Sequence, residues 1–303
     1  MVNERHVLAL RELGLNAKLM YFPAKAKVER FETTAPLVLA DEGIHTRDDD
    51  IFVVPESWAA LHKLIANLNV KKILHCQNAH YIFHGFENLE YIQIYGYQNI
   101  MVCSQYVKNF FIQNKNNCII DVVRPSIGEA FVRNGKDKKM QIAYMPRKRN
   151  TEAIYLQGLF KSKYPKYKDI PWVAIENVSQ YECAEILNES MIFASLSFME
   201  GLGLPPLEAM KCECVCVGFT GLAGIEYANE LNGYWVAEGD YDCFVQMLAT
   251  ALDDVANSDK TRARLISYAD TLKMFEHDYF KIDLLKFWKK ILHNKIDQYM
   301  IRL

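Results

Sequence analysis

Short apolar runs alternate with segments of helical spacing through most of this chain. In its second half the predicted strands are 141–145, 172–175, 191–196, 214–218 and 234–236, and the predicted helices are 151–160, 180–187, 205–211 and 241–255. Buried strands of this length, each separated from the next by a helix, form parallel sheets through right-handed crossovers. The chain is therefore predicted to be an α/β protein.

The first half repeats this alternation less regularly. Its predicted strands are 17–22, 51–55, 72–76 and 100–103, and its predicted helices are 4–13, 58–68 and 105–113. A polar stretch with lysine and glycine, 135–139, is the best linker candidate. We predict an N-terminal domain at 1–138, a C-terminal domain at 139–275 and a last helical segment at 276–303 that packs back on the first domain.

Two doubly wound, Rossmann-like domains that face each other across a cleft are the expected architecture. Because the chain opens on a helix, we expect the first domain to lack the strand with which such a domain normally begins. A length of 303 residues suits two domains of about 150 residues each.

Composition excludes several classes of protein. The net charge of −2 provides no field that would attract nucleic acid. No apolar run approaches the ~18 residues that a membrane span needs, and the polar start does not resemble a signal peptide. The eight cysteines are scattered through predicted core segments, without a disulfide framework. We therefore expect a cytoplasmic protein, and the inner face of the membrane is the alternative location.

The most informative segment is 195–210, which contains two glutamates, two glycines and two prolines. Pro205 stands where a helix begins, a position at which its missing N–H costs nothing. The free amides of that first turn can bind an anion such as a diphosphate. Glu200 precedes this helix and Glu208 lies within it, and carboxylates accept hydrogen bonds from sugar hydroxyls. These features together suit a nucleotide sugar.

With seven residues between Glu200 and Glu208, this segment resembles the E-x7-E motif of retaining glycosyltransferases of the GT-B fold, family four, of the bacterial polysaccharide type. Further segments resemble the same family in the same order: 102–108, 123–127, 218–226 and 233–240. The resemblance is strong over 142–252 and weaker over 72–131. It implies transfer of a sugar, with retention, from a nucleotide-sugar donor to a glycan or lipid-linked acceptor.

The resemblance also implies roles for individual residues. Glu208 would hold the ribose hydroxyls, and Glu200 would contact the donor sugar near the reacting carbon. The backbone amides of Leu202, Gly203 and Leu204 would meet sugar hydroxyls or the β-phosphate. The nucleotide sugar is a substrate, so no separate cofactor and no metal are expected.

A basic turn after the first strand of the second domain supplies candidate diphosphate ligands. Arg147 matches the position of the family's arginine. The family's lysine, five residues later, is replaced by Glu152, so Lys148 or Arg149 would have to serve. Cations there would neutralise the leaving diphosphate as its charge develops. The alternative interpretation is a solvated basic turn.

The first domain offers polar residues after the predicted strand 72–76. Related enzymes often carry a histidine in this loop that reaches the donor sugar, and the candidates here are Gln77, Asn78 and His80. Carboxyl ends of parallel strands border the cleft in such folds. The sequence does not choose among the three, and they could instead only satisfy loop backbone.

Other patterns carry less weight. Three cysteines alternate at 212–216, but no histidine or second cysteine pair stands at zinc-like spacing. The acidic run 48–50 precedes a strand, where the metal-binding D-x-D motif should follow one, and is interpreted as a turn. The amphipathic segment 279–292 favours packing on the first domain over peripheral membrane contact. Two rival functions are a non-catalytic nucleotide-sugar-binding homologue or partner subunit and a phosphorylase-like enzyme.

Overall fold

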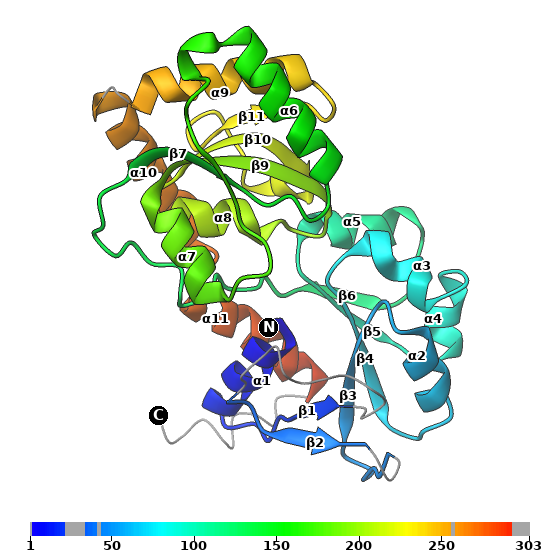
Figure 1. The fold of residues 1–303 in the computed structure, drawn as a ribbon. Coiled ribbons are helices and arrows are strands. Elements are labelled where there is room, and N and C mark those ends of the chain that lie inside the picture. Colours follow the sequence, from blue (N-terminus) through cyan, green and yellow to red (C-terminus); the bar gives the residue numbers. More distant parts are fainter. Residues whose placement is uncertain (1, 22–33, 41–43, 256–257, 293–303) are drawn as a thin grey trace.

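The structure is a computed structural model that describes residues 2–21, 34–40, 44–255 and 258–292. It has two lobes, each built on a parallel sheet (Figure 1). The strands are β1 (Leu19–Tyr21), β2 (Leu37–Leu39), β3 (Ile51–Pro55), β4 (Lys71–Cys76), β5 (Asn99–Val102), β6 (Ile119–Val122), β7 (Lys139–Tyr144), β8 (Trp172–Ala174), β9 (Ser190–Glu200), β10 (Val215–Leu222) and β11 (Tyr234–Val236). The two-lobed α/β architecture predicted from the sequence is confirmed.

The helices lie mainly on the faces of the two larger sheets, and one of them opens the described chain, as expected. They are α1 (Val2–Glu12), α2 (Ala59–Ile65), α3 (Ile82–Gly85), α4 (Glu90–Ile94), α5 (Gln105–Gln113), α6 (Asn150–Lys163), α7 (Gln180–Glu189), α8 (Leu204–Lys211), α9 (Tyr241–Val255), α10 (Ser258–Lys273) and α11 (His277–Ile291). Short 3₁₀ turns are η2 (Ala79–Tyr81), η3 (Pro165–Tyr167) and η4 (Ala223–Glu226).

The sheet of the first domain has the strand order β3-β4-β5-β6, so each strand pairs with its successor. The predicted strand at 17–22 does not join it. Its described part, β1, pairs with β2 in a separate two-stranded sheet. β6 and α10 were not predicted. β6 is short and leads into a polar stretch, which hides the strand pattern, and much of α10 is polar.

The second domain has the order β11-β10-β9-β7-β8. β8 pairs with one edge of β7. The later strands β9, β10 and β11 follow one another on the opposite edge of β7. The order therefore reverses between β7 and β9, which are paired neighbours at the centre of the sheet. Ligands of open α/β sheets bind outside the carboxyl ends of the strands at such a reversal.

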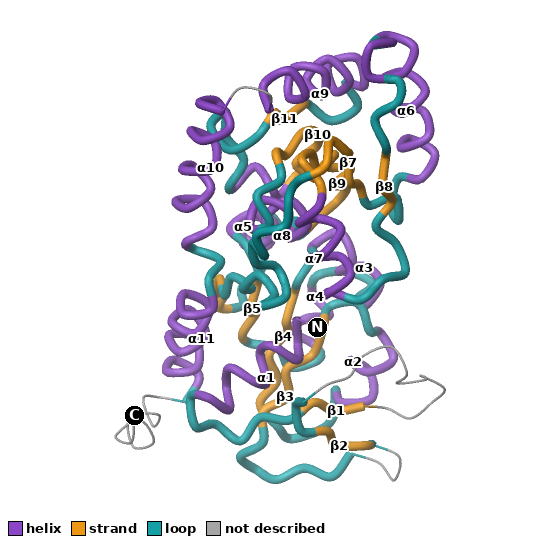
Figure 2. The backbone as a smooth tube through the Cα atoms, turned by 60° about the vertical axis from the view of Figure 1, so that its left-hand side comes forward, coloured by secondary structure: helices purple, strands orange, loops and turns teal. Residues whose placement is uncertain are grey.

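The C-terminal helix α11 packs against the first domain beside α1 (Figure 2). Its buried positions Phe280, Leu284, Phe287 and Ile291 follow the three- and four-residue spacing of one helix face. They join one apolar cluster with Ile73 and Met101 of β4 and β5, and each fully buried side chain of this size contributes roughly 1.5–3 kcal/mol. The apolar face of α11 is thus covered by protein and is not available to a membrane surface.

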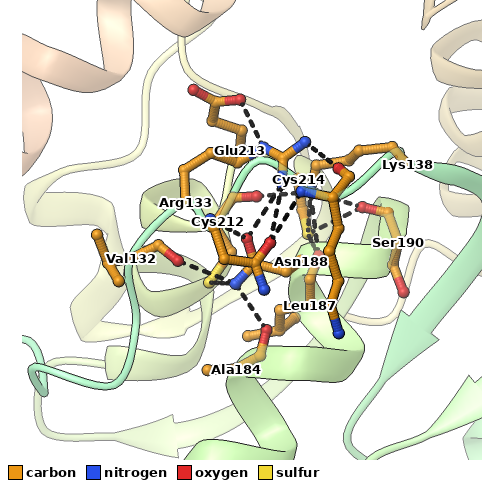
Figure 3. Close-up of polar contacts among 12 residues, drawn as sticks. Val132, Arg133, Lys138, Ala184, Leu187, Asn188, Ser190, Cys212, Glu213 and Cys214 are labelled. Carbon is orange, nitrogen blue, oxygen red and sulfur yellow. Dashed lines mark hydrogen bonds and ion pairs between the residues drawn. The ribbon is translucent and has the colours of Figure 1, made fainter.

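The predicted linker and the residues just before it are bound to the second domain before β7 begins (Figure 3). Arg133 forms an ion pair with Glu213 at 3.1 Å. The ammonium group of Lys138 donates hydrogen bonds, at 3.0, 2.9 and 2.5 Å, to the main-chain oxygens of Leu187, Ser190 and Cys212. Such charged hydrogen bonds to buried carbonyls hold the approach to β7 in a defined path. The boundary at residue 138 stays a prediction.

Candidate active site

The strand reversal in the second sheet brings two predicted site residues together. Lys148 follows β7 and Glu200 is the last residue of β9. Lys148 Nζ lies 2.7 Å from Glu200 Oε1 and donates a second hydrogen bond, at 3.0 Å, to the carbonyl oxygen of Phe198. Both side chains are about one-fifth exposed. The pair thus lies at the edge where such folds bind ligands, and solvent can still reach it.

The loop after β9 is shaped for a close approach to the first domain. Met199 has a φ of +48° and Gly203 a φ of +86°, so the backbone turns sharply on both sides of Gly201. A Cβ atom on Gly201 would lie only 1.8 Å from the carbonyl oxygen of Gln77. Only glycine leaves room for the first-domain loop at this point. The two domains therefore touch through this loop.

Side chains of the first domain fix this contact. Asn78 Nδ2 donates a 2.7 Å hydrogen bond to the carbonyl oxygen of Met199, the residue before Glu200. Ser104 donates from its hydroxyl to the carbonyl oxygen of Gly201. At the start of α5 the amide of Tyr106 donates to the carboxylate of Glu226, which belongs to the second domain. A carboxylate is stabilised at the positive end of a helix.

Glu208 lies on α8 and is 8% exposed. Within the described residues its carboxylate forms no hydrogen bond or ion pair. Burial raises the pKa of the Glu208 carboxyl to about 7, and the Arg5 guanidinium opposes that rise. A buried carboxylate without hydrogen-bond donors costs folding free energy. Hydroxyl donors of a ligand would relieve this cost.

Arg5 lies near the candidate residue Glu208, and sequence reasoning did not single it out. It lies on α1, is partly buried, and donates a hydrogen bond to the main-chain oxygen of Ser126. Burial lowers the pKa of Arg5, while Glu208 and Glu129 raise it. An arginine near the chain start carries no spacing signal that relates it to a glutamate about two hundred positions later. Only the packing of α1 brings their charges together.

The remaining basic residues of the turn differ in their surroundings. Arg147 is exposed, and no described residue forms an ion pair or hydrogen bond with its side chain. Arg149 is buried instead, forms ion pairs with Glu152 and Glu238, and lies over the ring of Phe198 at 4.4 Å. Of the three candidate cations, Lys148 is the one that contacts Glu200.

The three first-domain candidates also differ in the groups that they contact. The side-chain amide of Gln77 donates a 3.1 Å hydrogen bond to Asn3 Oδ1 on α1. Burial and the Lys148 ammonium lower the pKa of His80, while Glu200 acts in the opposite direction. His80 Nε2 also lies 3.3 Å from the hydroxyl of Tyr106. Asn78 and His80 are thus the members of this loop that border the Lys148–Glu200 pair.

The comparisons with known proteins decide the family. The chain is 32% identical, over 295 residues, to the "Alpha-1,6-glucosyltransferase" of Actinobacillus pleuropneumoniae serotype 7 (strain AP76), which covers 93% of this chain and 89% of that protein. The family described as "Glycosyl transferases group 1" matches residues 174–271, a range that includes Glu200 and Glu208. The chain belongs to the group 1 glycosyltransferases. It is a retaining glycosyltransferase of the GT-B fold, as the motif resemblance predicted.

Solved structures show the same glycosyltransferase fold at low identity. A glycosyltransferase from Rickettsia africae has a TM-score of 0.67 at 13% identity and covers 96% of this chain and 95% of its own. TarM of S. aureus in complex with UDP has a TM-score of 0.60 at 13% identity, and the pneumococcal O-GlcNAc transferase GtfA in complex with UDP and GlcNAc has 0.58 at 12%. They cover 81% and 77% of this chain, which spans 56% and 54% of their lengths.

Other features of this glycosyltransferase can be placed in the described part of the chain. No group of three or more potential metal-ligating side chains occurs among those residues. Cys212, Cys214 and Cys216 are buried and free, and burial raises the pKa of each thiol. Asp50 accepts a hydrogen bond from the amide of Arg47, as expected of a turn. No described helix is both long and apolar enough to span a bilayer.

Proposed function

We propose that this chain transfers glucose from UDP-glucose to a hydroxyl of a glycan or lipid-linked saccharide, with retention, and forms an α-1,6 linkage. The sugar and the linkage are those in the name of the A. pleuropneumoniae relative. UDP is the nucleotide bound by two of the structural neighbours. All eight cysteines are free, which supports a reducing, cytoplasmic location for the reaction.

The observation that carries the proposal is the Lys148–Glu200 pair at the strand reversal, beside Asn78 and His80. Lys148 is the cation that would meet the departing diphosphate, with exposed Arg147 as a second cation at its outer side. The free amides of the first turn of α8 add positive potential. These groups would stabilise negative charge as the bond to the sugar breaks, which is where electrostatic catalysis acts.

Recognition of the rest of the donor would fall to the neighbouring groups. Glu208 would accept hydrogen bonds from the ribose hydroxyls, which its buried carboxylate otherwise lacks. Glu200 and the amides of Leu202, Gly203 and Leu204 would orient the glucose, and His80 would border it from the first domain. Arg149, held by two glutamates, would shape the turn that carries Lys148.

The reaction exchanges one bond for another at the anomeric carbon of glucose. The bond from this carbon to the β-phosphate oxygen breaks, and UDP leaves with the electron pair. The acceptor oxygen attacks the same face, forms the new glycosidic bond and passes its proton to the departing diphosphate. Because the starting bond is α, retention makes the product α as well.

A donor panel tests the proposal. UDP release would be measured from UDP-glucose, UDP-galactose, UDP-GlcNAc and GDP-mannose, with α-glucosides of different length as acceptors. We expect release from UDP-glucose to exceed the others, with an α-1,6 product by NMR. Turnover of another donor would overturn the sugar assignment. Tight UDP binding without turnover of any donor would favour the non-catalytic homologue.

A further inference from the structure

A buried carboxylate behind the candidate site holds the loop that carries Asn78 and His80. Glu56 directly follows β3 and is 4% exposed. Its Oε1 accepts a 3.0 Å hydrogen bond from the amide of Asn78, and its Oε2 accepts a 3.3 Å hydrogen bond from the amide of Gln77. Each carboxylate oxygen thus binds one of two consecutive amides where β4 ends.

This arrangement fixes a chain of contacts that ends next to Glu200. The Asn78 side chain accepts from the amide of His80 at 3.0 Å and donates to the carbonyl oxygen of Met199 at 2.7 Å. Met199 precedes Glu200. The path from the Glu56 carboxylate to the end of β9 therefore consists of short hydrogen bonds and one peptide unit. A shift of the Gln77–Asn78 backbone would move both His80 and the contact with Met199.

The charge of Glu56 has no local cation to offset it. Within the described residues, no lysine, arginine or histidine side chain forms an ion pair with Glu56, and burial raises the pKa of its carboxyl. Gly85 packs against the Glu56 main chain, where a Cβ would lie 1.9 Å from the Glu56 carbonyl oxygen. A buried carboxylate without a cation costs folding free energy. The backbone amides of Gln77 and Asn78, together with its own amide, act against this cost.

We propose that Glu56 is a positioning residue for glycosyl transfer, which sets the place of Asn78 and His80 against the Lys148–Glu200 pair. This inference rests on the proposed function. Glu56 touches no part of the substrate. It acts on transfer through the loop, so its loss should reduce turnover rather than binding of UDP, which the second domain would hold through Glu208 and α8.

The test compares Glu56→Gln with Glu87→Gln, a control at an exposed glutamate of the same domain. The side-chain amide of glutamine has one acceptor oxygen, whereas the carboxylate has two. The NH₂ group of the variant would therefore face a backbone N–H that also donates, and one of the two hydrogen bonds would be lost. For Glu56→Gln we expect kcat to fall about 10–100-fold, as misplaced reacting groups do. The Kd of UDP should stay within about twofold of wild type, and Glu87→Gln should match wild type throughout.

A double-mutant cycle with Asn78→Ala separates positioning from general stability. If Glu56 acts through Asn78, Glu56→Gln should cost little further kcat in the Asn78→Ala background. Full additivity of the two effects, or a normal kcat for Glu56→Gln, would overturn the inference. A wild-type protein that turns over no donor would instead remove the proposed function, and the role of Glu56 with it.

Discussion

Lys148 and Glu200 stand 52 positions apart in the sequence, yet the ammonium nitrogen of one lies 2.7 Å from a carboxylate oxygen of the other. They meet because β7 and β9 are neighbours at the point where the strand order of the second sheet reverses. A partly exposed pair of this kind contributes little to folding, typically below about 1 kcal/mol. Its importance is expected to lie in charge placement next to the donor.

Replacement of Lys148 should therefore affect turnover far more than stability. For Lys148→Ala we expect kcat for UDP-glucose to fall about 10–1,000-fold, because a cation that stabilises the leaving diphosphate acts mainly in the transition state. The thermal midpoint should change by no more than a few degrees. Lys168→Ala, at an exposed lysine of the same domain, is the control. A large drop in melting temperature with normal turnover per folded molecule would make Lys148 structural.

Glu208 should be required for ribose recognition. Loss of a charged hydrogen-bond partner costs about 1.5–3 kcal/mol, so Glu208→Gln should weaken UDP binding roughly 10–150-fold by calorimetry. The wild type should also bind UDP more tightly than 2′-deoxy-UDP, and the variant should discriminate less between them. Equal affinity of wild type and variant for UDP would remove this assignment.

The raised pKa of Glu208 predicts a pH-dependent stability of the nucleotide-free protein. In the unfolded chain a glutamate titrates near 4.3, whereas the folded value is about 7. Between these values the folded state binds more protons, so stability falls as pH rises, by at most about 4 kcal/mol, and levels off above pH 7. Glu208→Gln stays neutral. Its melting temperature relative to wild type should therefore climb between pH 5 and 8.

The control for this measurement is Glu87→Gln, at an exposed glutamate outside the candidate site. Saturating UDP should stabilise the wild type much more than Glu208→Gln at pH 8. A pH-independent gap between Glu208→Gln and wild type would show that the carboxyl is ionised over the whole range, contrary to the effect of its burial.

Two glycine substitutions should change the stability of the folded protein in opposite directions. Gly201→Ala places a methyl group 1.8 Å from the Gln77 carbonyl oxygen, which must open the contact between the domains. We expect a lower melting temperature and a strong loss of turnover. Gly158 lies inside α6 with nothing within 4 Å of a new Cβ, so Gly158→Ala should stabilise by about 0.5–1 kcal/mol. Normal turnover of folded Gly201→Ala would argue against this contact as part of the site.

Transfer is expected to proceed without a divalent cation. Lys148, Arg147 and the start of α8 can offset the diphosphate charge, a task that bound metal performs where a carboxylate pair faces the phosphates. Initial rates with UDP-glucose should be the same in EDTA and in manganese. Activity abolished by EDTA and restored by manganese would mean that the diphosphate is bound elsewhere.

The sequence by itself determined the α/β class, most elements of the second domain and the motif from Glu200 to Glu208. These features depend on local physics. Apolar periodicity selects strand or helix, and the glycine and proline signals around Gly203 and Pro205 place a helix start. Family resemblance added the expected roles of the two glutamates, because a motif and its spacing are also local.

Tertiary structure alone decided which of the candidates meet. Arg149 forms ion pairs with Glu152 and Glu238, and Gln77 forms a hydrogen bond with α1. Lys148 is the candidate cation that forms an ion pair with Glu200. Tertiary structure also placed Arg5 and Glu56 near the candidate residues, although no motif or spacing in the sequence had indicated either of them. Strand order and helix packing set these contacts between distant positions, and residue spacing does not encode either of them. The motif predicts a donor site, and the packing of both domains decides which candidate side chains lie beside it.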